Sequence, residues 1–262
     1  MPASRRQMSV LEVVDQLRGL GVAEGDVLLV HASFRAARPV ERGPAGLIEA
    51  LALSLGPRGT LVLPSWTGDD DRPFDPAKTS AAADLGTVAD TFWRLPDVRR
   101  GDHPFAFAAR GPEAEYILSD PMALPPHQHA SAVGKVLDRD GRILLLGVDH
   151  EANTTLHLVE LLAGVPYRRP RHITVRGEAG PTRIDYLEND HCCELFLKAN
   201  LWLRRRGLQA EGRVGHAPSK LMRSRDLVEV AVRCLERDPF AFLHPRGAAC
   251  ADCAEAWQSI PE

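Results

Sequence analysis

Short runs of apolar residues alternate along the chain with longer stretches in which apolar positions recur at helical spacing. The first such stretch follows Ser9 and Glu12, which have the spacing of a capping box, and it continues on one helical face until Gly21. The next apolar run, residues 27–30, is too short for a helix and rich in β-forming residues, so it predicts a buried strand that ends at His31. The chain therefore begins with a helix followed by a strand.

The same alternation continues through the first half of the chain. Gly56 and Pro57 end a second helical stretch, and Pro64 follows a second strand-like run. The predicted helices cover residues 44–55, 88–93 and 131–137, and the predicted strands cover residues 60–63, 105–109 and 143–148. Strands that alternate with helices are typical of an α/β fold, with a mainly parallel or mixed central sheet covered by helices.

The second half of the chain changes character. Asn153 is placed to cap a helix that runs to Gly164, and residues 172–187 have the pattern of a hairpin. Amphipathic helices are expected after it. We therefore predict a single domain over residues 1–262, in which residues 188–262 form a partly helical C-terminal elaboration.

Composition and charge limit the partners of this domain. Of the 262 residues, 44% are hydrophobic and 26% charged, which is ordinary for a globular protein. The formal net charge of −3 provides no basic excess to neutralise phosphates, so nucleic-acid binding is disfavoured. Apolar runs such as residues 143–146 are far shorter than the roughly 20 residues that span a bilayer, so no membrane contact is predicted. We expect a cytoplasmic protein.

Polar clusters follow several of the predicted strands. Because open α/β sheets bind ligands at the carboxyl ends of their strands, these clusters are candidate site residues. They are His31 to Ser33, Ser65 and Trp66 with the acidic loop that follows, and the run from Asp149 to His157.

His157 is the candidate for proton transfer. It lies one turn inside a predicted helix, and Glu160 shares its face, where a carboxylate would orient the imidazole for general base catalysis. The alternative is a structural histidine on an apolar helix face, and spacing does not decide between the two. Glu188 and Asp190, after the hairpin, are either helix caps or carboxylates that reach across to His157.

The acidic loop after Trp66 also has two interpretations. Asp69, Asp70 and Asp71 form either a solvated turn, because aspartate is a common turn residue, or a negative rim that attracts a polycationic ligand. The sequence favours neither.

All five cysteines lie at or beyond residue 192, and their odd number argues against a secreted disulfide framework. The spacing of Cys250 and Cys253 is typical of half a zinc site, and His191, Cys192, Cys193 and His244 offer further donors. The preferred ligand set for a structural zinc is Cys193, His244, Cys250 and Cys253. The alternative is that these residues are plain buried thiols.

Several stretches of the sequence together resemble the aminoglycoside 3-N-acetyltransferase family. They are residues 30–35 (VHASFR), 43–50 (GPAGLIEA), 59–66 (GTLVLPSW), 153–157 (NTTLH) and 185–193 (DYLENDHCC). The resemblance implies transfer of an acetyl group from acetyl-CoA to the 3-amino group of the 2-deoxystreptamine ring of aminoglycoside antibiotics, and hence resistance to them. It also implies an α/β fold distinct from that of the common N-acetyltransferase superfamily.

The resemblance further implies roles for individual residues. His157 matches the general base of the family, and Glu188 and Asp190 match its carboxylate neighbours. Trp66 and Asp70 resemble residues that bind the drug. The residues that resemble coenzyme A contacts are His31, Ala32, Ser33, Phe34, Arg35 and His103. At position 32 the family commonly has serine, so any contact made by that hydroxyl is missing here.

Two other functions stay open at this point. A zinc-dependent hydrolase would use the His and Cys cluster to activate water, although four protein ligands would leave no open coordination position. A non-catalytic binding module held together by zinc is the other alternative.

Overall fold

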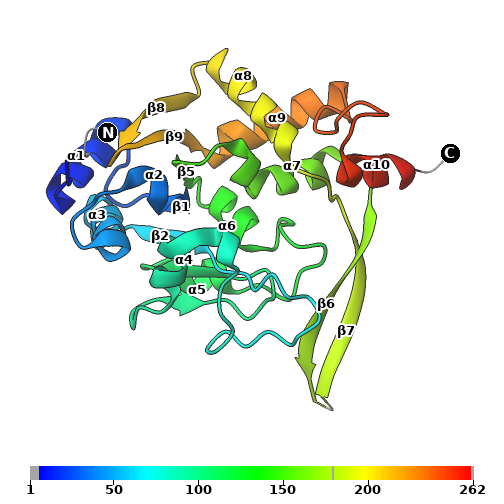
Figure 1. Ribbon diagram of the computed structural model, residues 1–262, viewed down its shortest axis with the longest axis horizontal. Coiled ribbons are helices and arrows are strands. Elements are labelled where there is room, and N and C mark those ends of the chain that lie inside the picture. The colour runs from blue at the N-terminus through cyan, green and yellow to red at the C-terminus, as the bar shows by residue number, and fades with distance from the viewer. Residues whose placement is uncertain (1–5, 179, 261–262) are drawn as a thin grey trace.

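The computed structural model describes residues 6–178 and 180–260, and its centre is a mixed seven-stranded sheet (Figure 1). The strand order is β3-β4-β2-β1-β5-β9-β8, with β2, β1 and β5 parallel and the remaining neighbours antiparallel. The strands are β1 (Val27–Ala32), β2 (Thr60–Pro64), β3 (Arg99–Arg100), β4 (Phe107–Arg110), β5 (Arg142–Leu146), β8 (Gln209–Val214) and β9 (Ala217–Arg223). The predicted α/β fold with a mixed sheet is confirmed.

Alternate side chains of the central strands contribute to two hydrophobic cores, one on each face of the sheet. Leu28 and Val30 belong to one core, and Val27 and Leu29 belong to the other, as the two-residue period of a strand requires. This double burial explains why β1 has a continuous apolar sequence.

Helices cover both faces of the sheet. The first core contains residues of α1 (Val10–Leu20), α3 (Gly43–Leu55) and α4 (Gly86–Trp93), and the second contains residues of α6 (Ala132–Asp138), α7 (Thr155–Ala163) and α9 (Ser224–Arg237). The shorter helices are α2 (Phe34–Ala37), α5 (Ala114–Leu118), α8 (Lys198–Arg204) and α10 (Ala251–Gln258), and 3-10 turns cover Ala83–Leu85, His150–Ala152 and Glu194–Leu197.

Local signals explain where two of these helices begin and end. Ser9 and Glu12 form the predicted capping box of α1, and Gly21 ends that helix in the left-handed conformation. At α7, Oδ1 of Asn153 accepts a hydrogen bond from the backbone N–H of Thr155, and Gly164 ends the helix at φ 65°. His157 therefore lies in the first turn of a helix that begins just beyond β5.

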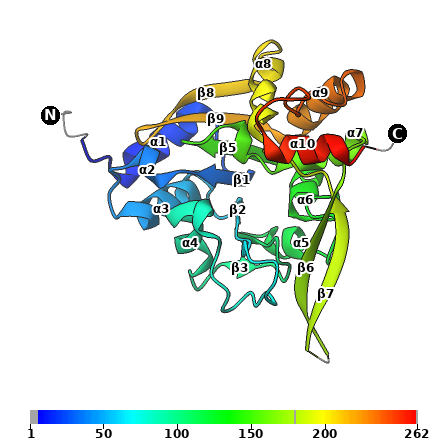
Figure 2. The same ribbon diagram turned by 45° about the vertical axis from the view of Figure 1, so that its right-hand side comes forward.

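A long hairpin extends from the body of the molecule (Figures 1 and 2). Its strands, β6 (Arg169–Gly177) and β7 (Gly180–Glu188), pair along their whole length as a separate two-stranded sheet. This confirms the predicted hairpin. The end where β6 begins and β7 ends lies against the body, so the residues there can contribute to a site.

Residues 188–262 are helical only in part, and two strands that were not predicted lie among their helices. They include β9, which pairs with β5, and the edge strand β8. The sequence of β8, QAEGRV, is mostly exposed and has no apolar run, so its periodicity did not identify it. Residues 1 and 262, the predicted ends of the domain, lie outside the described residues.

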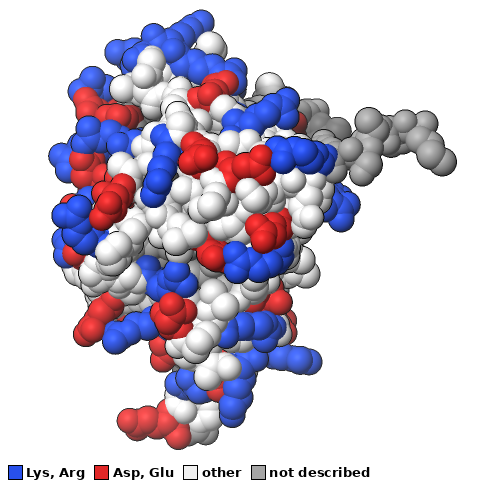
Figure 3. Space-filling model, turned by 90° about the vertical axis from the view of Figure 1, so that its left-hand side faces the viewer, with Lys and Arg blue, Asp and Glu red and all other residues white. Residues whose placement is uncertain are grey.

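Charges of both signs are interspersed on the face of the molecule in Figure 3, in keeping with the small net charge. Within the described ranges, none of the helices has the length and apolar character needed to cross a membrane.

Candidate active site

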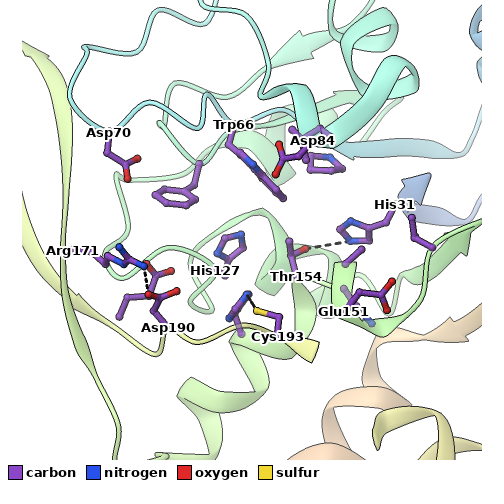
Figure 4. A pocket seen from close by; sticks show the side chains of 18 of the residues that line it. His31, Trp66, Asp70, Asp84, His127, Glu151, Thr154, Arg171, Asp190 and Cys193 are labelled. Carbon is purple, nitrogen blue, oxygen red and sulfur yellow. Dashed lines mark hydrogen bonds and ion pairs between the residues drawn. The ribbon is translucent and has the colours of Figure 1, made fainter. Parts of the chain in front are cut away.

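A cavity of about 480 Å³ opens where the parallel strands end (Figure 4). His31 and Ala32 at the end of β1 line it, as do Pro64 at the end of β2 and Thr154 and His157 at the start of α7. The base of the β6–β7 hairpin and the loop after β7 complete its wall. The cavity therefore occupies the carboxyl-end position at which open α/β sheets bind ligands.

His157 lies in this cavity between two partners. Its Nδ1 is 3.2 Å from Oε2 of Glu160, and its Nε2 is 3.7 Å from Sγ of Cys193. Glu160 is fully buried, and its Oε1 accepts hydrogen bonds from the hydroxyl of Tyr167 (2.5 Å) and from Nε2 of His191 (2.8 Å). Because a carboxylate only accepts hydrogen bonds, Glu160 keeps the proton of neutral His157 on Nδ1 and leaves Nε2 as the basic nitrogen. The predicted contact between His157 and Glu160 is confirmed.

The charges around His157 favour its protonated form. Burial acts against the imidazolium, but Cys193 and the Glu160 carboxylate outweigh this effect and hold the pKa of His157 well above its usual range. Burial also acts against the charged form of Glu160, but His191 and His157 outweigh it and lower the pKa of Glu160 to about 2. His157 must therefore lose a proton before it can act as a base.

The described residues that line the cavity include five carboxylates and one arginine. The acids are Asp70, Asp84, Glu151, Glu188 and Asp190, and the arginine is Arg171. Burial raises the pKa of Glu188 to about 7 and raises that of Asp70. A cavity lined by these acids is suited to a ligand that carries several positive charges.

Glu188 and Asp190 both line the cavity, but their partners differ from those expected. Oδ2 of Asp190 accepts hydrogen bonds from Arg169 (2.8 Å) and from Arg171, and Glu188 accepts one from the hydroxyl of Tyr186 (3.3 Å). Among the described residues, His157 is hydrogen-bonded to Glu160 and not to Glu188 or Asp190, although its charge acts on the nearby Glu188 carboxyl. Two arginines hold Asp190 at the base of the hairpin instead.

Aromatic rings also line the cavity. Trp66 lines the cavity, as predicted, and packs edge to face on Phe107 and His127 at centroid distances of 6.2 and 6.1 Å. His127 was missed, because a histidine in an irregular loop gives no sequence signal. It is 5% exposed, neither ring nitrogen has a hydrogen-bond partner, and its ring lies 5.5 Å from that of His157. Burial holds its pKa well below the usual value.

The loop expected to bind coenzyme A is only partly in the cavity. His31 and Ala32 line it, whereas Ser33, Phe34 and Arg35 lie beyond it at the start of α2. His103 is buried elsewhere: its Nε2 lies 3.2 Å from the carbonyl of Ala123, and its Nδ1 accepts a hydrogen bond from the N–H of Phe105. Backbone groups therefore occupy both nitrogens of His103, so the structure does not support its predicted contact with the cofactor.

One aspartate of the acidic loop lines the cavity, and another lies in an exposed turn. Asp70 faces the cavity, whereas Asp71 lies 2.8 Å from Nε2 of His172 on the hairpin. The hydroxyl of Thr174 also donates to the carbonyl of Asp70 at 2.8 Å. Contacts with β6 thus fix the position at which Asp70 enters the cavity.

Most of the chain matches one protein family. The sequence model described as aminoglycoside 3-N-acetyltransferase covers residues 29–236. The chain belongs to the aminoglycoside 3-N-acetyltransferase family. It is 61% identical over 234 residues to aminoglycoside N(3)-acetyltransferase IV from Salmonella sp, a match that covers 89% of this chain and 90% of the relative. It is 30% identical over 273 residues to aminoglycoside N(3)-acetyltransferase III from Serratia marcescens, covering 88% and 98%.

Solved structures of acetyltransferases have the same fold. The apoenzyme of aminoglycoside acetyltransferase AAC(3)-IVa matches with a TM-score of 0.97 at 58% identity, over 98% of this chain and 100% of that chain. A histidine-to-alanine mutant of AAC(3)-IVa in complex with a gentamicin has the same TM-score. The AAC-IIIb binary complex with CoASH matches with a TM-score of 0.80 at 25% identity, over 88% of this chain and 97% of that chain.

These matches confirm the function predicted from the sequence. The protein is an acetyl-CoA-dependent acyltransferase of the aminoglycoside 3-N-acetyltransferase family. The alternative of a zinc-dependent hydrolase is not supported.

The cysteines of this acetyltransferase are divided between the cavity and a separate cluster. Cys193 lines the cavity, whereas Sγ of Cys192 lies 3.7 Å from Sγ of Cys253 and within 4.8 Å of the ligand atoms of His244 and Cys250. The structure therefore brings Cys192, and not the predicted Cys193, close to His244, Cys250 and Cys253. The backbone turns at Cys193, where φ is 59°, so the two adjacent thiols have different surroundings.

Proposed function

We propose that the acetyl group of acetyl-CoA is transferred in this cavity to the 3-amino group of the 2-deoxystreptamine ring, with His157 as the general base. The observation that carries the proposal is the pairing of His157 with the buried carboxylate of Glu160, in a cavity lined by five acids. An aminoglycoside carries several ammonium groups at neutral pH. The acids attract it, and a base must free one amine for attack.

The ammonium loses two protons during the reaction. The first leaves to solvent by way of His157, and the neutral amine then attacks the thioester carbonyl carbon to form the C–N bond. As the tetrahedral intermediate collapses, the C–S bond breaks. Nε2 of His157 accepts the second proton from the nitrogen and delivers it to the leaving sulfur, which gives the thiol of coenzyme A. Glu160 holds the Nδ1 proton throughout and stabilises each imidazolium that forms.

Asp70 and Glu188 are the proposed contacts for the drug ammonium groups, and Trp66 supplies an apolar ring face. Burial raises the pKa of Glu188 to about 7, and an ammonium group beside it would favour the carboxylate form. Asp190 is less suited to this role because Arg169 and Arg171 already neutralise it. Since a gentamicin and apramycin are bound in structures of a relative, both are proposed substrates of this protein.

The coenzyme is proposed to enter past the end of β1. Burial lowers the pKa of His31 to about 3, so its ring is neutral, and its Nε2 lies 3.3 Å from the hydroxyl of Thr154. A neutral imidazole at this position suits the uncharged pantetheine arm. Arg35 is exposed at the start of α2, outside the cavity, where it would meet the anionic pyrophosphate.

His127 is the proposed donor to the thioester oxyanion. The negative charge that develops on the carbonyl oxygen needs a positioned donor in a site that excludes water. His127 is buried and neutral, and a neutral imidazole has one N–H to donate. Both its nitrogens lack a protein partner, and its ring packs against those of Trp66 and His157. Figure 4 shows His127 in the cavity beside Trp66.

The test is to incubate the protein with acetyl-CoA and a panel of aminoglycosides and to follow release of the coenzyme thiol. We expect release with gentamicin and apramycin, one acetyl group on each product by mass spectrometry, and a loss of roughly 10²-fold or more in His157→Ala. His129→Ala, on an exposed side chain paired with Asp138, is the control. Absence of release with every 2-deoxystreptamine drug would overturn the function, and unchanged turnover in His157→Ala would exclude His157.

We also propose a cytoplasmic location. The co-substrate acetyl-CoA is a cytoplasmic metabolite, and the five cysteines are free thiols, as is usual in a reducing compartment. Cell fractionation tests this: recovery of the protein from the periplasm or culture medium would contradict it.

A further inference from the structure

We infer that Cys192, His244, Cys250 and Cys253 bind one structural zinc ion at the start of α10. The ligands come from three segments of the chain: the loop after β7, the loop after α9, and α10 with the residue before it. The ligand atoms of Cys192, His244 and Cys250 all lie within 4.8 Å of one another, and Cys253 adjoins Cys192. Three cysteines and one histidine form a usual closed set for structural zinc.

The spacing of the sulfurs fits a metal centre. With Zn–S bonds of about 2.3 Å, the sulfurs of a tetrahedral site lie roughly 3.8 Å apart. The Sγ atoms of Cys192 and Cys253 are 3.7 Å apart. A disulfide would need about 2.05 Å between them, and both thiols are free.

A comparison of the two nearby histidines identifies the fourth ligand. His191 also adjoins Cys192 and Cys253, but its Nε2 is bonded to Glu160 and its Nδ1 accepts a hydrogen bond from the N–H of Cys193 (3.1 Å). His191 is therefore committed to the active site.

The ring of His244 is not committed in this way. Oε2 of Glu194 lies 3.3 Å from its Nε2, so Nδ1 is the nitrogen that would bind the metal. Carboxylates commonly accompany the histidine ligands of zinc. His244 is thus available to the metal.

The backbone around the cluster favours thiolates. The N–H of His244 donates to Sγ of Cys253 at 3.5 Å, and Cys250 occupies the N-terminal position of α10, where the helix dipole is positive. Zn²⁺ binds cysteine as the thiolate and releases its proton, so donors and a positive dipole beside the sulfurs favour the metal-bound form.

The zinc would attach α10 to the back of the active site. At eight residues, α10 is too short to be stable on its own. It lies beside the base of the hairpin (Figures 1 and 2), where Arg169 pairs with Asp252 (3.5 Å), with Glu255 and with Asp190 in the cavity wall. Metal binding at Cys192 thus also holds the loop that positions Asp190 and Cys193.

The test is the metal content of the purified protein, without drug or acetyl-CoA. We expect about one zinc per chain by mass spectrometry, released when a mercurial reagent titrates the thiols. Cys192→Ser and Cys250→Ser should retain roughly a tenth of this zinc or less. Cys193→Ser and Cys234→Ser are the matched controls, because Cys193 faces the cavity and Cys234 lies on α9, and both should retain it.

If the serine variants do not fold, Co²⁺ replaces zinc in the wild-type protein, and the absorption of a tetrahedral cobalt–thiolate centre is the expected result. Absence of zinc and of this absorption would overturn the inference. So would equal loss of zinc in Cys192→Ser and Cys193→Ser, or a disulfide between Cys192 and Cys253 in the isolated protein. Since the readout is metal content, failure here is distinguishable from failure of the proposed acetyl transfer.

Discussion

Replacing Glu160 by glutamine changes a single group of the side chain, yet we expect it to remove His157 as a base. Three donors converge on Glu160: Tyr167 and His191 on Oε1, and His157 on Oε2. Glutamine has one acceptor oxygen and one donor NH₂ group. His191 cannot change its tautomer, because its Nδ1 accepts from the N–H of Cys193. The glutamine oxygen therefore stays on Tyr167 and His191, and its NH₂ group meets Nδ1 of His157.

The consequence for His157 is a reversed tautomer. Nδ1 becomes the acceptor, the proton moves to Nε2, and the nitrogen that faces the substrate can no longer take a proton. Loss of a general base lowers turnover by roughly 10²–10⁴-fold, or about 3–5 kcal/mol in the activation barrier. The loss of the Glu160 charge also matters. At 3.2 Å and an effective dielectric constant of about 20, its attraction for the His157 imidazolium is at most about 5 kcal/mol. Loss of half of this interaction energy would lower the pKa of His157 by about two pH units.

The assay is thiol release by Glu160→Gln across a range of pH, at a temperature well below its unfolding transition. We expect kcat to fall by at least roughly 10²-fold, the KM for acetyl-CoA to change little, and the rise of kcat/KM with pH to shift to lower pH. Glu229→Gln, at an exposed position paired with Arg233, is the control. The reasoning is refuted if the folded variant retains kcat within about twofold of the wild type and its pH profile does not move.

Three further predictions concern the cavity. The wild-type kcat/KM should rise with pH, with a midpoint above the ordinary histidine pKa of about 6.5. The reason is that His157, whose pKa is raised, must lose a proton, and that Glu188, with a pKa of about 7, ionises over the same range. A midpoint below about 6.5 would contradict this. Asp70→Asn should raise the KM for the drug roughly tenfold without changing that for acetyl-CoA, and added salt should weaken drug binding to the wild type more than to the variant. Asp69→Asn, outside the cavity lining, is its control, and equal effects would exclude the role of Asp70. His127→Phe should lower kcat by roughly 10²–10³-fold, whereas His127→Gln, which keeps an N–H donor, should retain more activity; equal losses would exclude the oxyanion role.

Features that depend on local periodicity could be predicted from the sequence. The capping box of α1, the doubly buried run of β1 and the hairpin each have a short-range pattern that determines the element. The contact between His157 and Glu160 follows in the same way, because residues three apart on a helix are neighbours. Features that a short-range sequence pattern determines could thus be predicted without the structure.

Features that depend on distant partners could not be predicted. Arg169 and Arg171 meet Asp190 because β6 pairs with β7 and brings the start of β6 beside the residues that follow β7. His127 enters the cavity from an irregular loop that has no periodicity. The choice between Cys192 and Cys193 depends on the left-handed φ at Cys193, which a pair of adjacent cysteines does not reveal.

The loop of residues 189–193 connects the parts of this site. Asn189 donates a hydrogen bond to the carbonyl of Tyr167, and Asp190 accepts hydrogen bonds from Arg169 and Arg171. His191 is hydrogen-bonded to Glu160. Cys192 lies beside Cys253, and Cys193 contacts His157. Five consecutive residues thus have five different partners, so a displacement of the loop would disturb the drug side and the base together. Because the sulfur cluster holds the loop from outside the cavity, loss of the proposed zinc should raise the KM for the drug and lower kcat, and should change the KM for acetyl-CoA little.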